Sequence, residues 1–141
     1  MKKVISMYLF KSLLVAISTY SAIPVPQFEW NERNMKYAIC FFPAVGIFCG
    51  AALWGWFALA EVLAVSSFFF ATVATCLPLL ITGGIHMDGY MDTVDALASH
   101  QSRERKLEIL KGPTCGAFAV IYCGVYLLVY AGLMHELYTA N

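Results

Sequence analysis

The chain has 141 residues, of which 60% are hydrophobic and 13% are charged, and its formal net charge at pH 7 is zero. An average soluble domain carries about 25% charged residues, so this composition argues against a soluble globular protein. A neutral chain without a basic arm or an aromatic-basic repeat also lacks the signature of nucleic-acid binders, and no nucleic-acid partner is expected.

The first twenty residues predict a helix that lies at the membrane surface. Their start is basic, but Lys11 divides the apolar part, and the uninterrupted apolar piece Leu13–Ile17 is too short to cross a bilayer. A signal peptide would end in an A-x-A site, which is not evident, and a retained signal anchor is the alternative. Pro24 and Pro26 should end the helix, because proline cannot continue it. The polar segment 27–36 predicts a linker.

Three uncharged runs follow, and each is long enough to cross a membrane as a helix. They cover residues 38–60, 62–85 and 114–134, and each exceeds the roughly 20 residues that a helix needs to span the hydrocarbon core. Glu61 is the one charged side chain within or between the first two runs. All five cysteines lie in these runs without a C-x-x-C pair, so neither a zinc site nor a disulfide framework is indicated. A soluble all-α protein with buried helices is the alternative, but three such runs leave it too little polar surface.

Lysine and arginine are unevenly distributed among the segments outside these runs. Five precede the first run and four lie between the second and third, whereas the first connection and the C-terminal tail have none. Cytoplasmic loops are enriched in these residues, so the N-terminus and residues 86–112 are predicted to be cytoplasmic. Within 86–112, residues 87–97 and 103–110 are predicted to be helices, with Ser102 as N-cap of the second.

The expected fold is therefore an all-α integral membrane protein formed by a single membrane domain, residues 1–141. It has about three transmembrane helices, an N-terminal interfacial helix and an acidic cytoplasmic helical segment. The lipid bilayer is its first predicted partner.

Three aspartates are the most unusual feature of the cytoplasmic segment. Asp88, Asp92 and Asp95 stand at positions i, i+4 and i+7, which at about 100° per residue places them in one stripe on one helical face. Like charges at this spacing repel one another. Four alternative explanations of the stripe are open. The carboxylates are exposed to solvent, they are partly protonated, they line a path for protons or ions, or they bind a cation. The position of the stripe beside a membrane span, where ionisable groups are costly and usually functional, favours a bound cation.

Carboxylate oxygens favour a hard cation such as Mg²⁺ or Mn²⁺ over zinc. Mg²⁺ commonly takes one or two carboxylates and fills its other positions with water and substrate phosphate, so a diphosphate substrate suits this stripe. Basic residues of the same segment are candidates to bind the phosphates, and nearby glycines would allow close approach of backbone or ligand. The basic candidates are Arg103, Arg105, Lys106 and Lys111, and the glycines are Gly83, Gly84, Gly89 and Gly116.

His86 precedes the aspartates and is a candidate general acid or base. A metal ligand and an interfacial residue with one structural hydrogen bond are the alternatives. If the helix already includes His86, this residue lies about 160° around the helix from Asp88 and faces away from it.

Two long motifs carry a family resemblance that covers essentially the whole chain. GGIHMDGYMDTVDAL, followed by RERKLEILKGPTCGAFA, looks like the central signature of the cobalamin synthase family, whose members are adenosylcobinamide-GDP ribazoletransferases. YSAIPVP and FFPAVGIFCGA resemble the family's N-terminal landmarks. The resemblance implies a multi-pass, Mg²⁺-dependent enzyme of the bacterial cell membrane. Such an enzyme transfers adenosylcobinamide phosphate from adenosylcobinamide-GDP to α-ribazole or its 5′-phosphate, and releases GMP.

Asp88 and Asp92 match the first two aspartates of the family's motif, and the resemblance implies that they are metal ligands. Asp95 is either a further ligand or the catalytic base that takes the proton of the attacking hydroxyl. The basic residues of 103–111 would hold the guanylyl end of the donor. A CDP-alcohol phosphotransferase would need a D-G-x-x-A-R arrangement, which the residues after Gly89 do not form.

The chain departs from the family's pattern in sequence and in length. Gly112 stands where an aspartate is expected, and Ala96 and Ala119 replace glycines. Family members are also longer, so the later helices that would enclose the corrinoid are absent. The chain is therefore expected to be a fragment, a truncated gene product, or a subunit that works as a homo-oligomer or with a partner that supplies the missing C-terminal half. An inactive or partial remnant of the enzyme and a membrane protein that binds or transports cations are the alternative functions.

Overall fold

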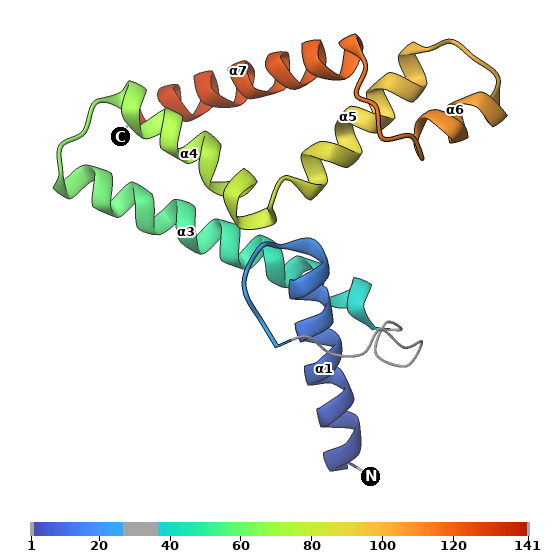
Figure 1. Cartoon of the computed structure of the whole chain (residues 1–141). Coiled ribbons are helices and arrows are strands. Elements are labelled where there is room, and N and C mark those ends of the chain that lie inside the picture. The colour runs from blue at the N-terminus through green and yellow to red at the C-terminus, as the bar shows by residue number, and fades with distance from the viewer. Residues whose placement is uncertain (1, 27–36, 141) are drawn as a thin grey trace. The chain divides into compact units, whose positions relative to one another are not determined.

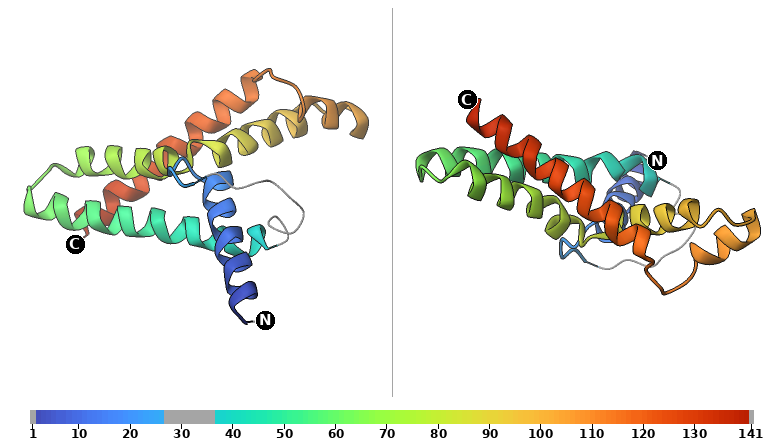
Figure 2. Two further views of the ribbon diagram at one scale, coloured as in Figure 1. Left: turned by 60° about the horizontal axis from the view of Figure 1, so that its bottom comes forward. Right: turned by 90° about the horizontal axis from the view of Figure 1, so that it is seen from above.

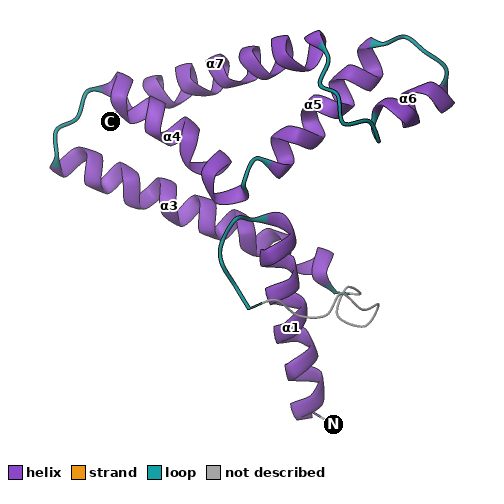
Figure 3. Ribbon diagram, viewed as in Figure 1, coloured by secondary structure: helices purple, strands orange, loops and turns teal. Residues whose placement is uncertain are grey.

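The computed structural model describes residues 2–26 and 37–140, and the described part is helical without a strand (Figure 3). The all-α fold class expected from the sequence is confirmed, while the linker predicted at 27–36 lies outside the described residues. The elements are labelled in Figure 1 and are, in chain order, α1 (Lys2–Tyr20), the 3₁₀ helix η1 (Ala38–Phe41), α3 (Phe42–Val62), α4 (Ser67–Thr82), α5 (Ile85–Ala98), α6 (Arg103–Ile109) and α7 (Ala117–Thr139).

Among the described residues, two helical stretches are long and apolar enough to cross a membrane, namely Ala38–Val62 and α7. Helices α4 and α5 pass the same test only as a pair that bends by 92° at Gly83 and Gly84. Both glycines have positive φ angles, of 64° and 76°, and this left-handed backbone ends α4. The run expected at 62–85 therefore forms a helix of 16 residues followed by a bend. If this bent pair counts as one span, the described residues contain up to three spans by length and composition.

Large apolar side chains on the long helices are exposed. Trp54 of α3 is 76% exposed and Leu128 of α7 is 75% exposed. Exposed apolar surface of this kind suits lipid or further helices better than water, which agrees with a membrane protein.

The chain forms two compact units. The first comprises residues 1–64 and 76–83, and the second comprises residues 65–75 and 84–141. In the first unit α1 packs against η1 and the start of α3. Val15, Ala16 and Ala38 form its buried core, and the ring of Tyr20 meets Phe42 edge-on at 5.2 Å between centroids. The N-terminal helix predicted from the sequence is thus part of a packed unit.

The segment after α1 contacts the end of α4 within the same unit. The backbone N–H of Ala22 donates a hydrogen bond to the carbonyl oxygen of Ile81 at 2.8 Å. A Cβ atom added at Gly83 would lie 3.3 Å from the Cβ of Ala22. Gly83 therefore combines a left-handed backbone with a close neighbour, and both features favour glycine.

The second unit is organised around α7. Helix α5 packs against α7 (Figures 1 and 2). The ring centroids of Tyr90 on α5 and Tyr126 on α7 lie 5.8 Å apart. Near the other end of α7, Tyr138 stacks on Phe70 of α4 at 4.2 Å between ring centroids. Aromatic pairs of this geometry add about 0.5–1.5 kcal/mol beyond the burial of their area.

The positive φ angles at the α4–α5 bend predict an order of stability among three glycine variants. Gly83→Ala should lower the unfolding temperature most, because a left-handed alanine costs roughly 1–2 kcal/mol and its Cβ would also crowd Ala22. Gly84→Ala carries only the backbone cost, since no atom lies within 4 Å of its added Cβ. Gly89→Ala is the control: it lies inside α5 with free space and should be neutral or stabilising by about 0.5–1 kcal/mol. Thermal unfolding of the detergent-solubilised chain measures the order, and a neutral Gly83→Ala would contradict it.

Candidate functional site

The carboxylate stripe begins in the first turn of α5. Gly84 is the N-cap of this helix, and its carbonyl oxygen accepts the N–H of Asp88 at 2.9 Å. A negative charge in the first turn is favourable, because the N-terminal end of a helix carries partial positive charge. Asp88 is exposed and Asp92 is half-buried, and no described residue donates a hydrogen bond to either carboxylate or forms an ion pair with it.

Asp95 differs from the other two aspartates because it contacts α7. Its Oδ2 accepts the backbone N–H of Gly116, and its Oδ1 accepts the N–H of Ala119 at 2.9 Å. Gly116 is the N-cap residue of α7, whose own side chain cannot cap the helix. The first four N–H groups of a helix have no partner inside it, and Asp95 satisfies two N–H groups at this end of α7. We refer to Asp95, Gly116 and Ala119 as the α7 cap.

The backbone at Gly116 lies too close to Asp95 for any side chain. A Cβ atom at this position would lie 2.6 Å from Oδ1 and 2.7 Å from Oδ2 of Asp95. By contrast, Ala119 is fully buried, so a methyl group fits at the second donor of the cap. Among the four glycines expected to permit close approach, Gly116 has the shortest contacts, while Gly84 and Gly89 have open space.

The basic residues lie on α6 and the turn after it. Ser102 caps α6 by accepting the N–H of Arg105 at 3.4 Å, and hydrogen bonds from its own backbone and from Ser102 hold the pKa of Glu104 below its usual range. Arg105 pairs with Glu108 at 2.5 Å on the exposed face, where an ion pair contributes little. Three basic side chains have no ion-pair partner among the described residues and are available to an anion: Arg103, Lys106 and Lys111.

His86 is separated from the carboxylates by the helix itself. Because α5 begins at Ile85, His86 belongs to its first turn and lies about 160° around the axis from Asp88. The imidazole is therefore on the side of α5 away from the stripe. Its role as acid or base stays a prediction.

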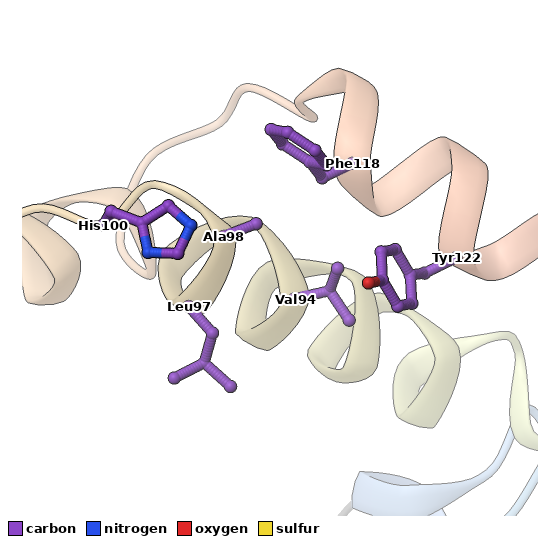
Figure 4. A pocket seen from close by; sticks show the side chains of 6 residues that line it. All are labelled: Val94, Leu97, Ala98, His100, Phe118 and Tyr122. Carbon is purple, nitrogen blue, oxygen red and sulfur yellow. The ribbon is translucent and has the colours of Figure 1, made fainter.

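A cavity of about 380 Å³ lies beside the α7 cap. Phe118 and Tyr122 extend into it from α7, and the remaining walls come from the end of α5 and the turn that follows (Figure 4). Its volume is within the range of about 300–1,000 Å³ that is typical of ligand pockets. The lining residues are Val94, Leu97, Ala98, His100, Phe118 and Tyr122. The sequence did not single out Phe118 and Tyr122, because aromatic residues in an apolar run are indistinguishable from lipid-facing ones.

The donor set of the stripe suits a hard divalent cation. No three His, Cys, Asp or Glu side chains lie close enough to share one metal ion in the part of the chain that the structure describes. Mg²⁺ requires fewer protein ligands, since one or two carboxylates with water and phosphate complete its coordination. Asp88 and Asp92 offer such a pair on consecutive turns of α5.

The sequence of this chain is similar to those of known proteins. A family model described as "Cobalamin-5-phosphate synthase" matches residues 12–140. The adenosylcobinamide-GDP ribazoletransferase of Lachnoclostridium phytofermentans is 51% identical over 89% of this chain and 48% of its own length. Proteins of the same name from Clostridium botulinum and Listeria monocytogenes are 34% and 38% identical, over 94% and 87% of this chain and 53% and 50% of their own lengths. No solved structure matches the chain.

Two facts follow from these similarities. The chain spans about half the length of the curated relatives that it matches. The match nevertheless includes nearly every residue of the chain, from α1 through the stripe and the cap to the end of α7. The chain therefore belongs to the cobalamin-5-phosphate synthase family.

Proposed function

We propose that this chain acts in the transfer of adenosylcobinamide phosphate from adenosylcobinamide-GDP to α-ribazole or its 5′-phosphate. A ribose hydroxyl of the acceptor forms a new bond to the phosphorus that carries the adenosylcobinamide. The diphosphate bond breaks and GMP leaves. The observation that carries the proposal is the pair Asp88 and Asp92, unpartnered among the described residues, in a chain of this family.

Asp88 and Asp92 are the proposed ligands of Mg²⁺. A divalent cation bound there would neutralise charge on the diphosphate and polarise the phosphoryl group. Arg103, Lys106 and Lys111 are proposed to bind the phosphates or the guanylyl end of the donor. Arg105 was predicted for the same task, and in the structure its guanidinium is engaged by Glu108.

The proton of the attacking hydroxyl needs an acceptor. Asp95 and His86 are the two candidates from the sequence, with Asp95 also a candidate third metal ligand. Each oxygen of Asp95 already accepts a backbone hydrogen bond, and His86 lies on the far side of α5 from Asp88. The carboxylate pair is thus the firmer part of the proposal.

The site is proposed to face the cytoplasm of a bacterial cell. Residues 86–112 carry four of the nine lysines and arginines of the chain, and the connection between α3 and α4 carries none. The beginning of α7 would then lie at the cytoplasmic surface of the bilayer, beside the cap and the basic residues.

The length of the chain shapes the proposal as well. Since the chain spans about half the length of its curated relatives, the remaining walls of a corrinoid site are proposed to come from outside this sequence, either from a C-terminal half or from a second copy of the chain. An inactive remnant and a cation-binding or transport protein are the alternative functions, and each gives a different experimental result.

The reaction itself tests the proposal. Membranes containing the chain, Mg²⁺, adenosylcobinamide-GDP and α-ribazole should release GMP, and Asp92→Asn should slow the release by about a hundredfold or more. Glu136→Gln, exposed near the end of α7 opposite the cap, is the matched control and should change the rate little. Wild-type rates in Asp92→Asn would disprove the metal-ligand role. Cation uptake by proteoliposomes without GMP release would support the transport alternative.

Gly112 offers a second test, because an added side chain fits there. A Cβ atom would lie 3.4 Å from the carbonyl oxygen of Ile109 and 3.6 Å from that of Glu108, which are ordinary contacts. Gly112→Asp should therefore leave the unfolding temperature unchanged and raise GMP release about tenfold or more if a fourth carboxylate strengthens the site. An unchanged rate in a folded, active protein would show that this carboxylate is not needed. GMP release only after the substitution would identify the natural chain as a remnant.

A further inference from the structure

We infer that Asp95 is a positioning residue, which fastens the start of α7 to α5 and thereby fixes the helix that presents Asp88 and Asp92. This inference deepens the proposed function and rests on it for the metal. It gives Asp95 a task different from the catalytic base or third ligand expected from the sequence.

The backbone at the start of α7 needs hydrogen-bond acceptors. This helix has 23 residues, is apolar enough to span a membrane, and begins directly after Gly116. Unsatisfied N–H groups are costly where water is scarce, and the start of a span needs acceptors from elsewhere in the protein. The α7 cap provides them across more than twenty positions of sequence, because Asp95 accepts from both Gly116 and Ala119.

Steric contact between Gly116 and Asp95 also holds α5 and α7 together. The Cα of Gly116 approaches the carboxylate so closely that even a methyl group would overlap both oxygens. A contact this close fixes the separation of the two helices at one point. The stacked rings of Phe70 and Tyr138 hold the opposite end of α7 within the same unit. Helix α7 thus has a fixed contact near each end, and the contact at its N-terminal end is with α5.

The three aspartates of the stripe differ in their hydrogen-bond partners. Asp92 lies three residues before Asp95 on the same face of α5, so an orientation fixed at Asp95 is also fixed at Asp92. Both oxygens of Asp95 are engaged by the backbone, and a metal ion or a hydroxyl proton would have to use their second lone pairs. Asp88 and Asp92 have no described partner and keep all of theirs.

Amide hydrogen exchange of the ¹⁵N-labelled full chain in detergent tests the cap without any substitution. The amides of Gly116 and Ala119 should be protected, whereas those of Ala117 and Phe118, which have no described acceptor, should exchange at least about tenfold faster. Equal exchange at all four positions would overturn the inference.

Paired substitutions then separate the cap from the metal ligands. Asp95→Asn and Gly116→Ala should each speed exchange at positions 116 and 119 about tenfold or more, and the double variant should add nothing further. Asp92→Asn and Gly124→Ala are the controls and should leave these amides protected, since Gly124 has open space around it. Unchanged protection in Asp95→Asn would contradict the cap.

Mn²⁺ binding, followed by electron paramagnetic resonance on the same variants, links the cap to the proposed function. Gly116→Ala keeps every carboxylate and should weaken Mn²⁺ binding about tenfold, as should Asp95→Asn, whereas Asp92→Asn should abolish it. If Asp95→Asn abolishes binding while Gly116→Ala leaves it intact, Asp95 is a ligand and the inference is wrong. A wild-type chain that binds no Mn²⁺ would refute the proposed metal site, and the exchange data would still decide on the cap.

The pH dependence of GMP release distinguishes a positioning residue from a catalytic base. A positioning residue carries no proton in the reaction, so Asp95→Asn should lower the rate and keep the shape of the pH profile. Loss of the acidic limb in this variant alone would identify Asp95 as the base.

Discussion

The beginning of α7 imposes the constraint on which the second unit of this protein depends. A helix that enters a bilayer begins with N–H groups that have no partner inside the helix and that lipid cannot satisfy. Here the acceptor is the Asp95 carboxylate on another helix, and its approach requires a residue without a side chain at position 116. One interaction thus fixes the end of α5, the start of α7 and the identity of Gly116.

The same constraint explains how three aspartates coexist on one helical face. Asp95 is neutralised in part by the positive end of α7, and Asp88 lies in the first turn of α5, where the helix dipole also favours a negative charge. Only Asp92 lacks such local support in the described structure. A divalent cation shared with Asp88 would stabilise the negative charge of Asp92, so the same ion would serve both the fold and the proposed chemistry.

Much of this structure could be predicted from the sequence because lipid imposes simple rules. Uncharged runs gave the long helices, Ser102 gave the start of α6, and the spacing of Asp88, Asp92 and Asp95 gave their common face. The bend at Gly83 could not be placed, because the run at 62–85 stays apolar through it. The cap was also missed, since no local pattern indicates that a carboxylate meets a backbone 21 positions later. The small residues at 116 and 119, three apart at the head of an apolar run, were its one trace in the sequence.

The organisation of the second unit depends on the hydrogen bonds from the backbone at the start of α7 to the Asp95 carboxylate. Scalar couplings across hydrogen bonds test for them most directly, measured between the ¹³Cγ of Asp95 and amide ¹⁵N nuclei in the labelled wild-type chain. The account predicts correlations from Asp95 to Gly116 and to Ala119, and to no other amide of α7. Absence of both correlations, with a ¹³Cγ signal of Asp95 that Mn²⁺ broadens as strongly as that of Asp92, would contradict it and place Asp95 among the metal ligands.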